Sequence, residues 1–129
     1  MVSADTNVIV RLLVGDDKAQ LEKAKLLFAQ ERIFIATSVV LECEWVLRYA
    51  YHFEPTAIAN AFQALFGLPN VTLQEPNVIA DAIAWHKQGM DFADAIHLAA
   101  SRQCRSLATF DRKFIKSAGK ITSFDVREP

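Results

Sequence analysis

Short apolar runs alternate with longer segments of helical spacing along this chain of 129 residues. The apolar runs predict short β-strands at residues 1–4, 33–36, 71–73, 106–109 and 121–124. The segments between them predict helices at residues 6–13, 18–30, 37–51, 57–66, 76–86, 91–102 and 110–117. Strands that alternate with helices are typical of an α/β protein with a parallel sheet.

Turn and cap residues mark the ends of these segments. Gly15 ends the first helix, and Asp16–Asp17 offers an N-cap and a negative first turn to the second. Thr37–Ser38 is expected to cap the third helix, and Pro55 suits the first turn of the fourth. These signals agree with the apolar periodicity, so the predicted element order has two independent supports.

The length of the chain predicts one compact domain over residues 1–129. A hydrophobic content of 52%, with nine Phe and two Trp, is enough to build a core. Charge nearly balances, with 14 basic and 15 acidic residues, so no global signature of a nucleic-acid binder is present. Locally, six basic residues lie at 102–120 with Asp111 as the only acid; this stretch suits either a phosphate-bearing substrate or a solvated surface.

The cysteines and the N-terminus indicate a compartment. Cys43 and Cys104 do not form a disulfide framework, and both are expected to be small buried hydrophobic residues in a reducing environment. The first residues lack the basic and apolar regions of a signal peptide, and no apolar run approaches membrane-spanning length. We therefore expect a cytoplasmic protein without a membrane partner.

Two acids follow predicted strands directly. Asp5 comes after the first strand, and Asp111 comes after the strand at 106–109. Each could simply cap the helix that it precedes. In parallel α/β sheets, however, ligands bind beyond the carboxyl ends of the strands. The shared position of Asp5 and Asp111 therefore favours a common crevice.

Two further acids lie inside predicted helices. Glu42 heads an apolar stripe that includes Trp45 and Tyr49, so its carboxylate should be paired, protonated or bound to metal. Glu44 has Arg48 four residues later and is expected to form a solvated surface pair, which favours Glu42 as the functional acid.

Asp94 begins a helix rich in small residues. It could be a favourable acid in the first turn after an N-cap at Asp91. Ala95 and Ala99 would also let this helix pack close to the sheet and bring the Asp94 carboxylate to the strand ends. A cluster of carboxylates suits Mg²⁺ or Mn²⁺, which prefer hard oxygen ligands. One ion could activate water, or two could clamp a phosphodiester; the sequence leaves the number open.

Four segments, in order, resemble the PIN-domain family, and more closely the VapC-like toxins of bacterial toxin–antitoxin pairs. They are residues 5–13, Leu41–Glu42 ahead of residues 45–48, residues 91–100, and residues 109–111. The resemblance covers essentially the whole chain. It implies a three-layer α/β/α sandwich with a mainly parallel central sheet, and a Mg²⁺- or Mn²⁺-dependent endoribonuclease.

The resemblance also assigns roles. It implies an acidic catalytic and metal site made of Asp5, Glu42, Asp94 and Asp111, with Asp111 the most variable position. Thr6 and Ser38 fall where family members often place a hydroxyl near the site. An RNA substrate, a cognate antitoxin and a homodimer are the implied partners.

Neighbouring cations complete the hypothesis. Arg112 and Lys113 are candidates to contact the RNA backbone beside the acids.

Two alternatives stay open. The first is a catalytically silent PIN-like protein-binding module whose acids only cap helices. The second is a haloacid-dehalogenase-like phosphatase, but that class needs a second Asp where this chain has Asn7. No glycine-rich phosphate loop or zinc motif is present.

Overall fold

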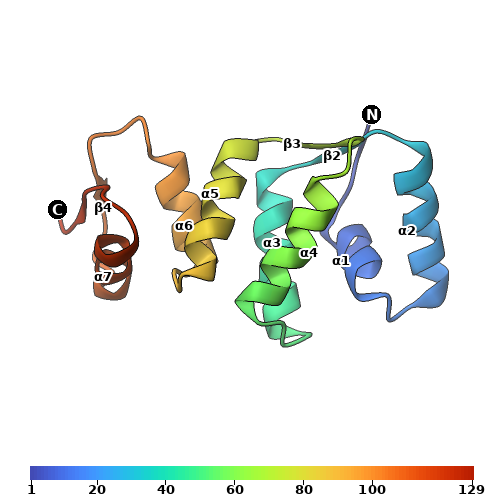
Figure 1. The fold of residues 1–129 in the computed structure, drawn as a ribbon, viewed down its shortest axis with the longest axis horizontal. Coiled ribbons are helices and arrows are strands. Elements are labelled where there is room, and N and C mark those ends of the chain that lie inside the picture. The colour runs from blue at the N-terminus through green and yellow to red at the C-terminus, as the bar shows by residue number, and fades with distance from the viewer. The chain divides into compact units, whose positions relative to one another are not determined.

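The computed structural model describes all residues, 1–129, and confirms the predicted α/β class with parallel strands (Figure 1). The chain divides into two compact units, Met1–Pro76 and Asn77–Pro129. No helix in either unit combines the length and the apolar character that a bilayer crossing requires. The single domain over 1–129 stays a prediction.

The N-terminal unit contains a parallel sheet of three short strands in the order β1–β2–β3. These are β1 (Val2–Ser3), β2 (Ile33–Ile35) and β3 (Val71–Leu73). Ser3 pairs with Phe34, and Phe34 with Thr72, so the carboxyl ends of all three strands point the same way. The two Ile side chains of the central strand β2 are fully buried, which makes this strand the core of the unit.

Four helices connect these strands: α1 (Thr6–Val14), α2 (Lys18–Gln30), α3 (Thr37–Tyr49) and α4 (Pro55–Phe66). Helix α1 packs against α2 and α3, and α4 packs against α3 and β3. The burial of their apolar faces is the main source of their stability, because isolated helices of this length are marginal in water. The largest buried side chains of these helices are Ile9, Phe28, Leu47, Ile58 and Phe62.

Most of the predicted caps are confirmed. Gly15 ends α1 in the left-handed conformation with φ 72°, and the Asp17 carboxylate accepts a hydrogen bond from the Gln20 N–H of α2. The expected cap at Thr37–Ser38 is wrong: α3 begins at Thr37 after Ala36, without a side-chain cap. The reason is tertiary, because the Thr37 hydroxyl donates instead to Glu75 Oε1 at 2.8 Å, in the segment after β3.

The C-terminal unit is built on the helix α5 (Pro76–Lys87), whose first residue is the junction, and on α6 (Phe92–Ala100). Strand β4 (Leu107–Ala108) pairs in parallel with β5 (Val126–Arg127). Helix α7 (Arg112–Ile121) connects these two strands and packs against β5. The buried side chains of the unit include Ile79, Met90, Phe92, Leu98 and Phe114.

The last predicted strand, at 121–124, is wrong. Ile121 is the final residue of α7, and the strand lies at Val126–Arg127. Thr122 caps the helix through its N–H to the Ala118 carbonyl, and its hydroxyl accepts from the Phe124 N–H at 3.2 Å. The chain therefore turns at 122–124 and becomes available for pairing with β4 only afterwards.

Candidate functional site

Asp5 is placed by the end of β1 and the start of α1. It is the N-cap of α1, and its Oδ1 accepts a hydrogen bond from the Thr6 N–H at 2.8 Å. The N-terminal end of a helix carries a partial positive charge, which stabilises a carboxylate there. The side chain is exposed, so it is available to a ligand as well as to the helix.

Glu42 reaches the same place from α3. The two carboxylates line one cleft of about 290 Å³, together with Thr6, Asn7, Val10, Arg11, Val46, Ala50 and Tyr51. Burial, and after it the charges of Glu42 and Asp5, raise the pKa of the neighbouring Cys43 thiol to about 12. The N-terminal unit thus brings together one predicted pair of acids.

The environments predicted for the two acids of α3 are wrong. Glu42 is exposed, and its stripe faces solvent, with Trp45 53% and Tyr49 61% exposed. Glu44 is only 1% exposed, and its Oε2 accepts from Arg48 Nε at 2.8 Å. The predicted pairing with Arg48 is confirmed, but it is not a solvated surface pair.

The physical reason lies in the helix period. The buried residues of α3 are Val40, Cys43, Glu44 and Leu47, which are spaced i, i+3, i+4 and i+7. Glu42 therefore lies off the buried face. The choice of Glu42 as the functional acid stays a prediction. The position of Glu42 in the cleft with Asp5 supports this choice, because an exposed carboxylate is accessible to a ligand and a buried one is not.

The C-terminal unit brings together the other predicted pair. Asp111 follows β4 and is the N-cap of α7, accepting from the Phe114 N–H at 3.1 Å. Asp94 lies in the first turn of α6, whose N-cap is Asp91. Burial raises the pKa of Asp94, the charges of Asp91 and Asp111 raise it further, and His97 and Lys113 lower it. Asp94 therefore carries negative charge that its surroundings do not fully compensate.

This chemistry fits a hard divalent cation. Ionised carboxylates are acceptors only. Burial is the first cause of the raised Asp94 pKa, and a cation beside Asp94 and Asp111 would offset the smaller contribution of like charge. Neither unit gathers three or more His, Cys, Asp or Glu side chains into a metal-binding group. Each unit brings together two of the four predicted acids, so a single metal site made of all four carboxylates stays a prediction.

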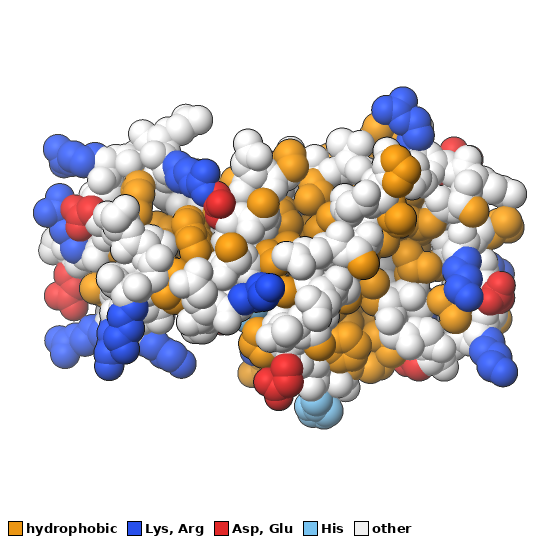
Figure 2. All heavy atoms as spheres, viewed as in Figure 1, with side chains coloured by type: hydrophobic (Ala, Val, Ile, Leu, Met, Phe, Trp, Pro, Cys, Tyr) orange, Lys and Arg blue, Asp and Glu red, His pale blue; other side chains and the backbone are white.

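The other predicted site residues have different environments. Thr6 is 6% exposed, and its Oγ1 is buried without a hydrogen-bond partner at the cleft that holds Asp5. Ser38 is exposed in the first turn of α3 and does not line that cleft. Arg112 is exposed and pairs with Glu128 at 3.7 Å, and Lys113 is also exposed. Figure 2 shows Lys and Arg side chains gathered around α7.

Sequence reasoning missed two residues of the cleft, Arg11 and Tyr51. Arg11 Nη1 donates to the Tyr51 hydroxyl at 3.0 Å, and the hydroxyl donates to Asp16 Oδ2 at 2.8 Å. Arg11 Nε donates to Gln20 Oε1 at 2.6 Å. This network raises the pKa of Arg11, first through Tyr51 and then through the charge of Asp16. Arg11 lies in a segment that carries the family resemblance, but no sequence signal connects it with Tyr51.

Comparison with known proteins gives one family match. Residues 2–120 match the family described as PIN domain, so the match extends through both compact units. Among solved structures, VapC20 of Mycobacterium tuberculosis, described as a toxin that cleaves the sarcin–ricin loop, is 21% identical, with a TM-score of 0.46. The alignment covers 97% of this chain and 99% of that chain. No curated protein matches the sequence.

The raised pKa of Asp94 predicts how stability depends on pH without metal. The folded state holds the Asp94 proton more tightly than the unfolded state, so stability falls as pH rises through the window above the ordinary value of 3.8. Asp94→Asn removes this charge and should raise the melting temperature at neutral pH. The gain should shrink toward zero as the pH falls below about 4, because the wild-type carboxyl is then also neutral.

Thermal unfolding in a chelator, between about pH 3 and pH 7, checks this expectation. The competing effect is the favourable interaction of a first-turn carboxylate with the helix α6. A lower melting temperature for Asp94→Asn at neutral pH would show that the helix interaction outweighs burial and like charge.

Proposed function

Since the chain belongs to the PIN-domain family, we propose that it is a metal-dependent endoribonuclease and the toxin of a toxin–antitoxin pair. The observation that carries this proposal is the pairing of acids. Asp5 and Glu42 line one cleft, while Asp94 and Asp111 are coupled in the other unit, and all four lie within the segment that matches the family. Each pairing brings together two of the acids that the resemblance assigns to the site, and this is the main support for the proposal.

In this proposal the two pairs serve one reaction, with Asp5 and Asp94 as the principal metal ligands and Glu42 and Asp111 in support. Bound Mg²⁺ or Mn²⁺ supplies Lewis acidity and a lowered pKa of bound water. Asp5 and Asp111 each use one oxygen to cap a helix, which fixes the direction of the carboxylate. That preorganisation reduces the cost of orienting the ligands when RNA binds.

Neighbouring polar groups would position the RNA. Lys113 is close enough to lower the Asp94 pKa, so we propose that it contacts a phosphate beside the acids, with Arg112 next to it. Thr6 lines the Asp5 cleft and its buried hydroxyl has no hydrogen-bond partner, so we assign it a contact with substrate or water that forms when the side chain rotates toward the cleft. Ser38 is the weakest of the predicted contacts, because it does not line the cleft.

We also propose a cognate antitoxin, a homodimer and a cytoplasmic location, as for VapC-like toxins. Exposed large apolar side chains give such contacts a physical basis, since buried apolar surface drives association. Trp45 and Tyr49 stack at 4.9 Å on the exposed face of α3, and Leu26 and Phe110 are also exposed.

A second function, a catalytically silent protein-binding module, is favoured by one observation. Asp5 and Asp111 both cap helices, which is sufficient to explain their presence. A phosphatase of the haloacid-dehalogenase type has no comparable support, because Asn7 occupies the position of its second Asp.

RNA cleavage by matched acid variants separates the nuclease from the silent module. Asp94→Asn should lower Mg²⁺- or Mn²⁺-dependent cleavage by at least about 100-fold, because a metal contact provides several kcal/mol of transition-state stabilisation. Asp91→Asn is the matched control: it lies three residues away and retains an N-cap side chain, so its cleavage should stay near that of the wild type. Equal activity in Asp94→Asn and the wild type would sink the metal assignment.

Thr6→Val tests the hydroxyl with little change in shape. Because Oγ1 accepts and donates no hydrogen bond in the folded protein, the substitution should leave the melting temperature unchanged or raise it. Cleavage should fall roughly tenfold if the hydroxyl contacts the substrate or water. The measurement is kcat/KM beside a melting curve, and unaltered kcat/KM would remove Thr6 from the site.

Metal addition should stabilise the folded protein. An ion that binds only the folded state adds about 2.7 kcal/mol at a concentration of 100 Kd. Titration with Mn²⁺ should therefore raise the melting temperature of the wild type, and the rise should be smaller for Asp5→Asn. If millimolar Mn²⁺ shifted both proteins equally, the binding site would lie elsewhere.

A further inference from the structure

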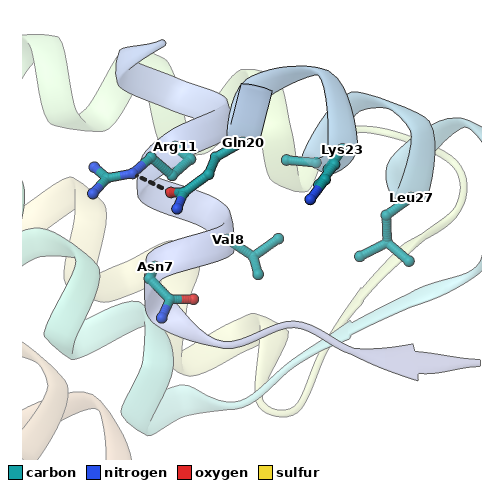
Figure 3. A pocket seen from close by; sticks show the side chains of 7 residues that line it. Asn7, Val8, Arg11, Gln20, Lys23 and Leu27 are labelled. Atoms are coloured by element: carbon teal, nitrogen blue, oxygen red, sulfur yellow. Dashed lines mark hydrogen bonds between the residues drawn. The ribbon is translucent and has the colours of Figure 1, made fainter. Parts of the chain in front are cut away.

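A second groove lies between the helices α1 and α2 (Figure 3). Its volume is about 530 Å³. Helix α1 contributes Asn7, Val8 and Arg11, while α2 contributes Gln20, Lys23, Ala24 and Leu27. Both walls belong to the N-terminal unit, so the groove is complete within one compact part of the chain.

This groove borders the cleft of Asp5 and Glu42 along α1. The two cavities share Asn7 and Arg11, which lie one helical turn apart on α1. A ligand held at the acid pair could therefore extend along α1 toward Lys23. The Arg11 side chain is fixed at this junction by Gln20, Tyr51 and Asp16.

The charges along the groove suit an anionic chain. Its lining contains two cations and two amide side chains but no carboxylate. The positive charge of Arg11 is partly neutralised by Asp16, whose Oδ1 lies 3.3 Å from Arg11 Nη1. Lys23 is exposed and has no carboxylate within ion-pair distance, whereas Lys25 on the same helix pairs with Glu22 at 3.6 Å. Lys23 is therefore the cation in this groove with the most charge available for a ligand.

We propose that the α1–α2 groove holds the RNA strand next to the scissile phosphodiester, with a backbone phosphate against Lys23. The inference rests on the proposed function, and it adds a binding surface that the acids do not provide. The Asn7 and Gln20 amides offer donors and acceptors to sugar or base edges. Single-stranded nucleic acid binds in such grooves through its phosphates, whatever its sequence.

An acidic peptide is the other polyanion that such a groove could hold. We favour RNA, because the groove shares Asn7 and Arg11 with the cleft of the carboxylates where, under the proposed function, a phosphodiester would be cut. Without a cation, Asp5 and Glu42 would repel a peptide carboxylate and an RNA phosphate alike, so the preference for RNA rests on the proposed metal-dependent cleavage.

Charge reversal at Lys23 tests the proposal, with Lys25→Glu as the matched control on the same exposed helix. In an Asp94→Asn background that does not cleave, Lys23→Glu should weaken binding of single-stranded RNA by roughly tenfold, the equivalent of one charge-assisted contact. The slope of log Kd against log salt should fall by about 0.7, the loss of one phosphate contact. Lys25→Glu should change the affinity by less than about twofold.

In the active protein, Lys23→Glu should lower kcat/KM for long RNA and leave cleavage of a dinucleotide unchanged, because the single internucleotide phosphate of a dinucleotide is the scissile one and none is left for Lys23. Equal RNA affinities for the Lys23 and Lys25 variants would overturn the proposal. The proposal would also be overturned if Lys23→Glu left the RNA affinity intact but abolished binding of poly-glutamate. The same holds if it abolished a dimer measured by light scattering while RNA affinity stayed intact.

The two levels of the inference fail separately. If the wild-type protein bound RNA through Lys23 but cleaved none, the proposed nuclease activity would be refuted and the RNA-binding role of the groove would stand. Cleavage of long RNA that does not depend on Lys23 would refute the groove alone.

Discussion

Parallel pairing of the short strands is the constraint from which the rest of the N-terminal unit follows. Each strand must return to the same end of the sheet before it can pair, so helices have to connect β1 to β2 and β2 to β3. These connections place the starts of α1 and α3 just beyond the carboxyl ends of β1 and β2. Asp5 lies at the first of these positions, as the N-cap of α1, and the same logic places Asp111 between β4 and α7. Glu42 lies farther along its helix, at the sixth residue of α3.

The cost of placing acids at these junctions is electrostatic. Burial, and then the like charges of Asp91 and Asp111, raise the pKa of Asp94, while the charges of Glu42 and Asp5 add to the effect of burial on the pKa of Cys43. A protein that needed only helix caps could use Ser or Thr there without this repulsion. The paired carboxylates are therefore the feature on which the proposed metal site rests.

Helix α1 connects the two cavities of the N-terminal unit. Asn7 and Arg11 face both, and the Arg11 guanidinium reaches α2 through Gln20 and the loop after α3 through Tyr51. The same helix begins at Asp5, whose carboxylate faces the cleft. The element that positions the first acid therefore also shapes the groove where a substrate strand would extend.

Much of this molecule could be predicted from local chemistry. The periodicity located all seven helices and four of the five strands, and Gly15, Asp17 and Pro55 marked true helix ends. Such features depend on neighbours within a few residues, so the sequence contains them directly. Local patterns also pointed to the four acids: Asp5 and Asp111 follow strands, Asp94 lies in the first turn of its helix, and Glu42 heads an apolar stripe.

Tertiary structure decided what depends on distant partners. Burial of Glu44 and exposure of Glu42 follow from which face of α3 meets its neighbours, and both faces looked plausible in sequence. The Thr37 hydroxyl was expected to cap α3 but donates a hydrogen bond to Glu75 instead. A further hydrogen bond connects Arg11 with Tyr51, which is 40 residues away in the sequence. Long-range contacts leave no periodic signal, so the acids could be named from the sequence while their environments could not.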